Sequence, residues 1–440
     1  MKTVSFTSIL PLLIFVLVFL GCGIYFGDFY ALPSPVAVLV GIIAAFILFK
    51  GSFNDKVEQF LSGCGDHKIL SMCIIYLLAG AFATVSKSVG SVEVIVNYGL
   101  QWVPLAYIPV GIFVIAAFIS IASGTSVGTI VALGSVAMGF AEGGVDANYI
   151  GAALLGGAML GDNLSMISDT TIAATQSLGC SMKDKFKTNI AIALPAAVLS
   201  IVLYIVFTQE AVLSTVPNLP QNDGGNWLLA LPYLLVIVLS LLGVNVFLVL
   251  LIGVAFSGGL GLILSGLDVM GLSKKIYEGF TSMQEIFLLS LLTGGLAAMV
   301  EKAGGITYIL SAIKQRISGY RTALLGVGSL VAVVDMATAN NTISIIISGK
   351  VAKTISETFR IQPKNMASVL DIFSCVVQGV LPYGAQVLIL IALSEEKIQY
   401  LTLLSYSFYP LLLLISALLW IAFGKRHTEE VDSKLTSPSS

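Results

Sequence analysis

The chain carries little charge. Asp, Glu, Lys and Arg together make up 10% of its 440 residues, whereas hydrophobic residues make up 57%. A soluble domain has about a quarter of its residues charged, so this composition excludes a water-soluble body of this length. Lipid is then the expected solvent, and helices satisfy their own backbone hydrogen bonds within it. We therefore expect an all-α polytopic membrane protein in a lipid bilayer.

Residues that hold metals and cofactors are also scarce. The chain has two histidines and five cysteines, and the cysteines show no paired spacing. This excludes a disulfide framework and a Cys/His metal site, and we expect no cofactor. The sequence has neither an H-E-x-x-H motif nor a nucleophile elbow, so an enzyme is not expected. The formal net charge of −2 and the lack of a basic face also argue against a nucleic-acid partner.

Long apolar runs are abundant. A spanning helix needs about 20 mostly apolar residues, and we interpret the first run as such a helix rather than a signal peptide, because it has no A-x-A-like end. Segments 148–178 and 366–395 are too long for one plain helix, and segment 339–349 is short, so these three are candidates for broken helices. The predicted apolar segments are 9–26, 35–50, 69–86, 103–121, 125–140, 148–178, 189–208, 227–242, 243–264, 282–300, 321–337, 339–349, 366–395 and 399–423.

Basic residues gather in a few loops. Positive charge prefers cytoplasmic loops, and counting the segments as crossings places most basic clusters on one side, with both termini in the cytoplasm. Lys183, Lys185 and Lys187 form one of these predicted cytoplasmic loops. The lysines that fall on the opposite side are Lys87, Lys274, Lys275 and Lys397.

The chain also repeats itself. Residues 77–90 resemble 291–304, and 125–129 fall opposite 338–342. Each unit holds about five crossings, an odd number that inverts the second unit; inverted-topology repeats with broken helices at the midplane are typical of secondary transporters. The predicted divisions are N-terminal helices at 1–68, a first transport repeat at 69–208, connecting helices at 209–281, an inverted second repeat at 282–424 and a cytoplasmic tail at 425–440.

The most informative stretch runs from Gly161 to Thr171. It places Asp162, Asp169 and several hydroxyls inside an apolar segment that has no Lys or Arg. Intramembrane ionisable groups usually face a wet cavity and mark an ion path. A continuous helix would put both carboxylates on one face, whereas a break would let Ser168 or Asp169 cap a second half-helix. The alternative is that both aspartates are only caps or lie in a surface loop.

Two further stretches are rich in small and amide residues. Gly and Asn tolerate an unwound turn, so Asn340 and Asn341 are predicted to line a site. For Gly124 and Gly128, close helix packing is the preferred interpretation. Gln386 follows a Pro-containing stretch that resembles a second helix break, and we expect it to line the same cavity.

Clustered oxygen atoms suit a hard cation or a proton. A carboxylate binds either one, so a single carboxylate can exchange the two by competition. We expect Asp162 and Asp169 to be the Na⁺ ligands. The other predicted ion- or substrate-binding residues are Asn163, Ser165, Ser168, Thr170, Thr125, Ser126, Asn340, Asn341, Thr342 and Asp371.

These motifs are similar to those of a known family. Residues 123–186 contain Gly-Thr-Ser-x-Gly-Thr and Gly-Asp-x-x-Ser-x-x-Ser-Asp-Thr-Thr, and residues 301–304 read Glu-Lys-x-Gly. This stretch resembles the NhaC-type sodium/proton antiporters of the ion transporter superfamily, and the resemblance covers nearly the whole membrane region. The chain departs from the family pattern in its second half, where Asn340 stands in place of an acidic residue and no Arg precedes Asp371.

The resemblance implies a secondary antiporter that exchanges Na⁺ for H⁺ by alternating access in a bacterial-type cytoplasmic membrane. The alternative is a Na⁺- or H⁺-coupled transporter of a small organic anion or amino acid, because the neutral amide of Asn340 can bind a carboxylate or an ammonium group. We expect Asp169→Asn to abolish transport and Asp162→Asn to impair it at least in part. The sequence leaves open whether two copies form a homodimer.

Overall fold

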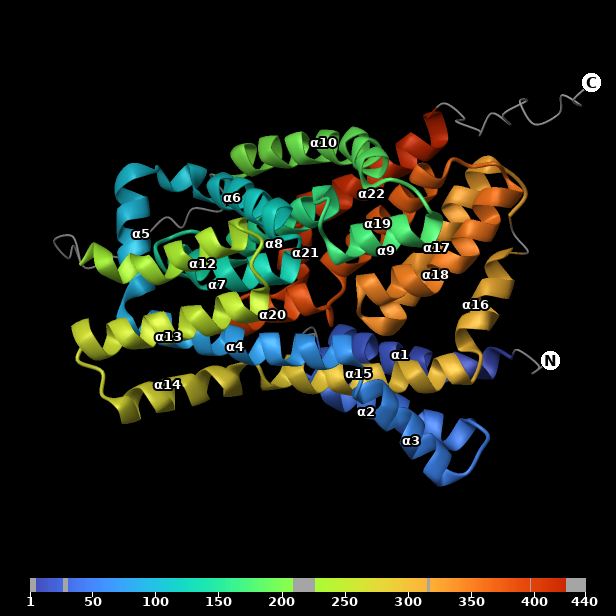
Figure 1. Ribbon diagram of the computed structural model, residues 1–440, viewed down its shortest axis with the longest axis horizontal. Helices are drawn as coiled ribbons and strands as arrows, with labels where there is room; N and C mark the ends of the chain where they lie inside the picture. The colour runs from blue at the N-terminus through green and yellow to red at the C-terminus, as the bar shows by residue number, and fades with distance from the viewer. Residues whose placement is uncertain (1–4, 27–30, 209–225, 315–316, 396, 425–440) are drawn as a thin grey trace, which may run out of the picture.

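The computed structural model of the chain describes residues 5–26, 31–208, 226–314, 317–395 and 397–424. Every regular element in these ranges is a helix. Eight of the described helices are long and apolar enough to cross a membrane, or up to nine when a bent pair near the C-terminus counts as one span. Most of them run along the long axis of the molecule (Figure 1). The predicted class, an all-α polytopic membrane protein, is confirmed.

The helices before residue 209 follow one another through short connections. They are α1 (Leu10–Phe26), α2 (Ser34–Leu48), α3 (Phe53–Cys64), α4 (His67–Val89), α5 (Ser91–Trp102), α6 (Ile108–Ser123), α7 (Ser126–Glu142), α8 (Ala147–Leu164), α9 (Asp169–Leu178) and α10 (Met182–Val206), with short 3₁₀ turns η1 (Phe6–Ser8) and η2 (Leu105–Tyr107).

A second series of helices follows residue 225. They are η3 (Trp227–Ala230), α12 (Leu231–Leu241), α13 (Val246–Leu264), α14 (Val269–Ser282), α15 (Gln284–Lys302), α16 (Gly305–Lys314), α17 (Tyr320–Thr338), α18 (Asn341–Thr358), α19 (Pro363–Val380), α20 (Ala385–Leu393), α21 (Tyr400–Tyr406) and α22 (Phe408–Phe423).

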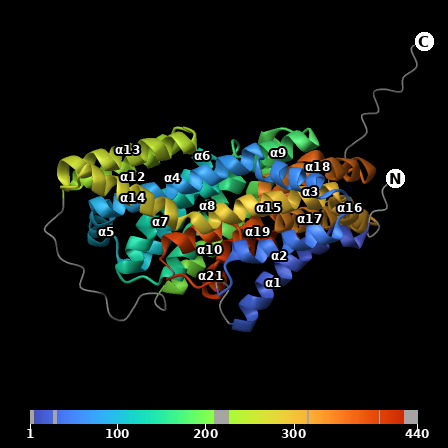
Figure 2. The ribbon, with the colours of Figure 1, turned by 90° about the horizontal axis from the view of Figure 1, so that it is seen from below.

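The short helices α5 and α16 stand in corresponding places of the two parts. Each follows a glycine in the left-handed region, Gly90 with φ 89° and Gly304 with φ 86°, where other residues are strained. They lie at opposite ends of the long axis in both views (Figures 1 and 2). This is the placement that an inverted repeat predicts; the inversion itself and the domain boundaries stay predictions.

Two of the three predicted broken helices are confirmed. Segment 148–178 is interrupted at 165–168, between α8 and α9, and segment 366–395 at 381–384, between α19 and α20. Segment 339–349 is not broken within itself: it belongs to α18, which is continuous and extends to Thr358, and the interruption lies at 339–340, between α17 and α18. The apolar run ends at Lys350, but Lys and Ala are good helix formers, so the helix continues beyond it.

Four helices were not predicted, namely α3, α5, α14 and α16. They are only 10 to 14 residues long and each presents a mixed surface, so a search for long apolar runs passes over them. A serine with its reciprocal aspartate shows how such a helix begins: Ser52 accepts a hydrogen bond from the Asp55 amide, and the Asp55 carboxylate accepts one from the Ser52 amide. This capping box satisfies two backbone donors at the start of α3.

At the centre of the molecule, α8 packs closely against α6. α8 is buried along nearly its whole length. A Cβ atom at Gly157 or Gly161 would collide with the backbone carbonyls of Phe113 or Ala117 in α6. Without side chains at these positions the two backbones approach closely, as small residues allow in membrane helices. The end of α8, where the motif residues begin, is thereby fixed against α6.

Candidate functional site

A polar cavity of about 140 Å³ lies where four helix interruptions meet. Its wall comes from the junctions α6–α7, α8–α9, α17–α18 and α19–α20, so both parts of the chain contribute. Irregular backbone at membrane depth is tolerated only where protein covers it or where it lines a cavity. The lining residues are Met72, Ile75, Gly124, Thr125, Ser126, Val127, Gly128, Asp162, Asp169, Thr170, Val246, Asn340, Asn341, Thr342, Gln378 and Gln386.

Asp162 is the buried carboxylate of this cavity. It lies in the last turn of α8 and only 6% of its surface is exposed. Ser126 Oγ donates to Asp162 Oδ2 at 2.8 Å, and Thr170 Oγ1 lies 3.5 Å from Oδ1. No lysine or arginine in the described ranges forms an ion pair with it. The negative end of the α8 dipole adds to its charge, so the position favours a bound cation or proton.

Asp169 has a different environment. It is the first residue of α9, lines the cavity and is exposed. Ser168 is the N-cap of α9, and its Oγ accepts the Thr171 amide at 3.2 Å. Of the two arrangements open from the sequence, the break capped by Ser168 is therefore confirmed. Asp162 and Asp169 lie on two separate helices rather than on one helix face.

Two glutamines from the second part of the chain reach Asp162 through Ser126. Gln378 Nε2 donates to Gln386 Oε1 at 2.8 Å, and Gln386 Nε2 donates to Ser126 Oγ at 3.1 Å. Because Gln386 donates to the serine, the serine hydroxyl proton is free to point at Asp162. Such directional chains polarise one another, so the second part strengthens the donor that faces the carboxylate.

Thr125 and Asn340 have the same role in the two parts. Each is an N-cap: Thr125 Oγ1 accepts the Gly128 amide at 3.1 Å, and Asn340 Oδ1 accepts the Ile343 amide at 3.0 Å. The N-termini of α7 and α18 consequently both reach the cavity. Asn340 Nδ2 also lies 3.1 Å from the Met72 sulfur. Thr125, Ser126, Thr170, Asn340, Asn341 and Thr342 are thus the predicted neutral site residues that line the cavity.

Four predicted site residues do not line the cavity. Ser165 Oγ donates to the Ile121 carbonyl at 2.8 Å, which ties the end of α8 to α6. Ser168 serves as the cap described above. Asn163 and Asp371 belong to a second polar cluster, which does not line the cavity.

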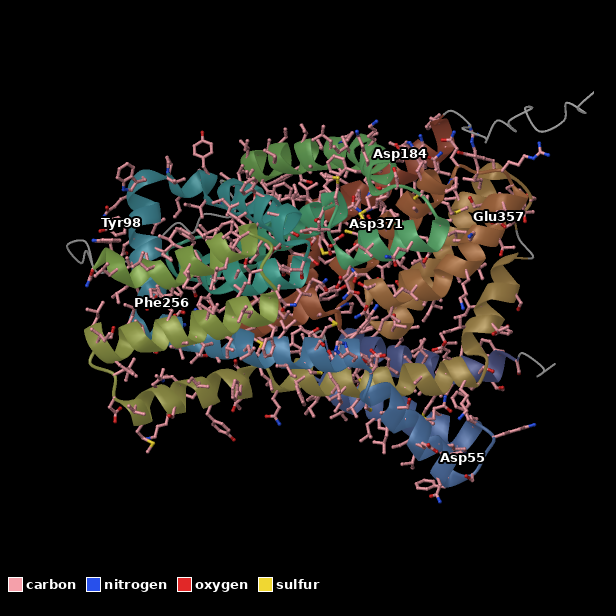
Figure 3. All side chains as sticks on the ribbon, in the orientation of Figure 1. Asp55, Tyr98, Asp184, Phe256, Glu357 and Asp371 are labelled. Atoms are coloured by element: carbon pink, nitrogen blue, oxygen red, sulfur yellow. The ribbon has the colours of Figure 1, made fainter. Side chains whose placement is uncertain are left out.

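The second cluster is built around a buried ion pair. Lys185 Nζ lies 2.6 Å from Asp371 Oδ2, and each side chain is 1% exposed. Asn163 Nδ2 and Asn189 Nδ2 donate to the same carboxylate oxygen at 3.0 and 2.8 Å. Figure 3 shows Asp371 among the central helices. Asp371 is therefore a paired residue, whereas Asp162 has no ionic partner.

The placement of Lys185 corrects a prediction. Sequence counting put it in a cytoplasmic loop with Lys183 and Lys187, but all three lie in the first turns of α10, and Lys185 alone is buried. Residues two apart on a helix face different sides, which a count of charges ignores. Asn189, four residues after Lys185 and on the same face, was the available signal. Gln378 was missed as well, although it lies just before the Pro-containing stretch that was predicted as the second helix break.

A larger cavity, of about 370 Å³, lies at the opposite ends of α7 and α20. Glu142 lies 3.4 Å from Lys87 and 3.0 Å from Lys397, and Lys87 also lies 2.8 Å from Glu395. The predicted outside lysines Lys87, Lys275 and Lys397 all line this cavity. Its charges are paired and partly exposed, and such pairs are worth little. The unpaired buried carboxylate makes the smaller cavity the candidate site.

Helix breaks from two parts of one chain, meeting at a buried carboxylate, define a secondary transporter. The sequence model of the Na⁺/H⁺ antiporter family matches residues 3–208 and 226–425, and the chain belongs to this family. The predicted resemblance to NhaC-type antiporters and the prediction of a secondary Na⁺/H⁺ antiporter are confirmed.

Named relatives show the range of the family. The chain is 22% identical to the Na⁺/H⁺ antiporter NhaC of Alkalihalophilus pseudofirmus, covering 90% of this chain and 92% of that protein. It is 25% identical to the malate-2H⁺/Na⁺-lactate antiporter of Bacillus subtilis, covering 75% of each. It is 23% identical to the arginine/ornithine antiporter ArcD of Halobacterium salinarum, covering 87% and 85%.

Proposed function

We propose that Asp162 binds Na⁺ and H⁺ in turn and that the chain exchanges these two cations by alternating access. One observation carries the proposal. The Asp162 carboxylate is buried, faces the cavity and receives hydroxyl donors, yet it has no ion-pair partner among the described residues. Sodium and proton belong to the family description; the residue that binds them is our assignment.

Competition at one carboxylate explains coupled exchange. An unpaired charge is costly in a low-dielectric interior. Either bound cation neutralises Asp162, so the loaded site passes between the two sides at lower cost than the empty, charged site. Because both cations need the same oxygens, binding of one releases the other. Exchange then needs no further ionisable group in the cavity.

Neutral oxygens of the wall would complete the Na⁺ shell. The hydroxyls of Ser126 and Thr170 already contact Asp162, and hard cations favour oxygen ligands. Asp169, exposed on the cavity wall, would raise the local cation concentration without being part of the buried site.

A second candidate is coupled transport of a small organic substrate that carries an ammonium group. Four amide side chains line the cavity, and the described lining includes two carboxylates and no basic side chain. This charge favours a cationic or zwitterionic substrate over an organic anion. Thermal-shift screening of amino acids, with and without Na⁺, separates the candidates: stabilisation by an amino acid supports the second, and stabilisation by Na⁺ alone supports the first.

The direct test uses purified protein in liposomes that contain a pH-sensitive dye. A Na⁺ gradient should drive proton movement with the wild-type protein and not with Asp162→Asn, while both reconstitute equally. Failure of the wild-type protein to move protons on Na⁺ addition, from mildly acidic to alkaline pH, would refute Na⁺/H⁺ exchange. We further propose transport without catalysis, in a bacterial-type cytoplasmic membrane with both termini inside.

A further inference from the structure

Lys185 is a buried cation with a complete set of oxygen partners. Its Nζ lies 2.6 Å from Asp371 Oδ2, 2.6 Å from Thr171 Oγ1 and 3.4 Å from the carbonyl oxygen of Asn163. An ammonium group has three N–H donors, so these three oxygens use all of them. The side chain therefore has no free donor to offer to a ligand in the neighbouring cavity.

The same oxygens are those that would hold a metal cation. They are a carboxylate, a hydroxyl from the first turn of α9 and a backbone carbonyl from the last turn of α8. In transporters with broken helices, the C-terminal carbonyls of half-helices coordinate Na⁺, and the negative end of a helix favours a cation. Two more oxygens of the cluster, Asn189 Oδ1 and Asp371 Oδ1, are buried and have no hydrogen-bond partner.

The cluster is separate from the cavity but is joined to it through the backbone. Neither Lys185 nor Asp371 lines the cavity. Asn163, which contributes its carbonyl to Lys185 and its amide to Asp371, follows Asp162 directly. Thr171, the other Lys185 partner, donates its hydroxyl to the Ser165 carbonyl at 2.8 Å. Lys185 thus contacts both sides of the α8–α9 break.

We infer that Lys185 is a tethered cation that permanently fills a second cation site, and that it positions Asp162 as the buried carboxylate that faces the cavity and can exchange ions. Its charge neutralises Asp371, and its contacts with Asn163 and Thr171 hold the break from which Asp162 faces the cavity. The inference rests on the proposed function only in taking Na⁺ as the transported ion. It adds that this chain contains a latent Na⁺ site, occupied by its own lysine.

The test removes the tethered cation and offers Na⁺ in its place. Lys185→Ala leaves room beside Asp371, and Lys185→Ala/Asp371→Asn removes the carboxylate as well. Lys187→Ala is the matched control, because Lys187 lies on the same helix and is exposed. Melting temperatures of the purified proteins are compared in sodium chloride and in choline chloride of equal strength.

Ligands that bind only the folded state raise its melting temperature. We expect Na⁺ to raise the melting temperature of Lys185→Ala by at least about 5 °C more than that of the wild type. The double variant and Lys187→Ala should show only the wild-type shift. A folded Lys185→Ala protein whose Na⁺ response equals that of the wild type would overturn the inference.

If Lys185→Ala aggregates in both salts, two further variants test whether the charge of Lys185 is required. Lys185→Arg keeps the charge and Lys185→Met keeps the length of the side chain. We expect Arg to retain Na⁺-driven proton movement within about threefold and Met to lose at least about tenfold; a fully active Met variant would refute a required charge. The Na⁺-dependent rise in melting temperature is measured without transport, so its result does not depend on whether the wild type exchanges Na⁺ for H⁺.

Discussion

Asp162 and Asn163 are neighbours in the sequence, yet their side chains serve two different sites. Asp162 faces the open cavity and accepts from Ser126, whereas Asn163 donates to the buried Asp371. The last turn of α8 thus separates a carboxylate that can exchange its partner from one that is already paired. Substitutions at the two sites should therefore differ in their effect on transport.

Asp162→Asn should reduce Na⁺-driven proton movement to the level of empty liposomes, while expression stays near normal. The amide cannot bind H⁺ or supply the negative charge that holds Na⁺, but it fits the same space and can still accept from Ser126. Dye fluorescence in proteoliposomes measures the loss. Retained exchange in this variant would remove Asp162 from the mechanism.

Asp169→Asn should be the milder substitution, although the sequence alone favoured it as the more severe one. An exposed charge at a cavity attracts cations but is screened by salt. We expect the KM for Na⁺ to rise about two- to fivefold, with the maximal rate kept. Adding 0.5 M choline chloride should remove most of the difference from the wild type, because at that strength screening acts over only about 4–5 Å. Complete loss of transport at every salt concentration would instead place the exchange at Asp169.

Ser126→Ala removes the donor closest to the Asp162 carboxylate. A hydrogen bond to a charged group contributes about 1.5–3 kcal/mol, and about 1.4 kcal/mol corresponds to a tenfold change in affinity. The KM for Na⁺ should therefore rise about 10- to 100-fold. Ser135→Ala, on the same helix but at the other cavity, is the control and should behave as wild type. An unchanged KM in Ser126→Ala would show that Na⁺ does not use this side of the carboxylate.

The sequence predicted the long apolar spans and two of three broken segments, but it predicted neither the short helices α3, α5, α14 and α16 nor the different roles of the site residues. The breaks are marked by residues whose local chemistry is readable: Ser168 as an N-cap, and Asn340 where the backbone must turn. Lys185 and Asp371, by contrast, are 186 residues apart in the chain and pair only through tertiary packing. The sequence made Asp162 a Na⁺ ligand and Asp371 a further residue of the same site, because nothing local to Asp371 shows that a distant lysine pairs with it.

Asn340 departs from the family pattern, and substitutions at this position test what the departure does. Asn340→Asp keeps an N-cap oxygen for the Ile343 amide, so stability should change little, whereas Asn340→Ala loses about 1 kcal/mol with the cap. The aspartate also adds a second carboxylate to the cavity wall. We expect tighter Na⁺ binding at alkaline pH in Asn340→Asp, measured by calorimetry, and no tightening in Asn340→Ala. Weaker binding in Asn340→Asp would indicate that Asn340 faces away from the ion.

The two left-handed residues that precede the caps offer a matched pair of backbone tests. Gly124 has φ 72° and Ala339 has φ 49°, a region in which a residue with a Cβ is strained. Ala339→Gly relieves strain of about 1–3 kcal/mol, but it makes the unfolded chain more flexible, which costs about 0.4–1 kcal/mol, so the two effects oppose one another. Its melting temperature should stay within a few degrees of the wild type.

Gly124→Ala reverses both effects, and the added strain outweighs the gain from a less flexible unfolded chain. It introduces the same strain, and its Cβ would also lie 3.0 Å from the backbone of Ile167, within the α8–α9 break. We therefore expect a loss of at least about 1–3 kcal/mol, seen as a lower melting temperature. Because Ile167 lies between Ser165 and the Ser168 cap, the clash should also displace Asp169 and Thr170 from the cavity wall and raise the KM for Na⁺. Equal stability of the two variants would show that the break adapts freely, which a site held by fixed contacts cannot do.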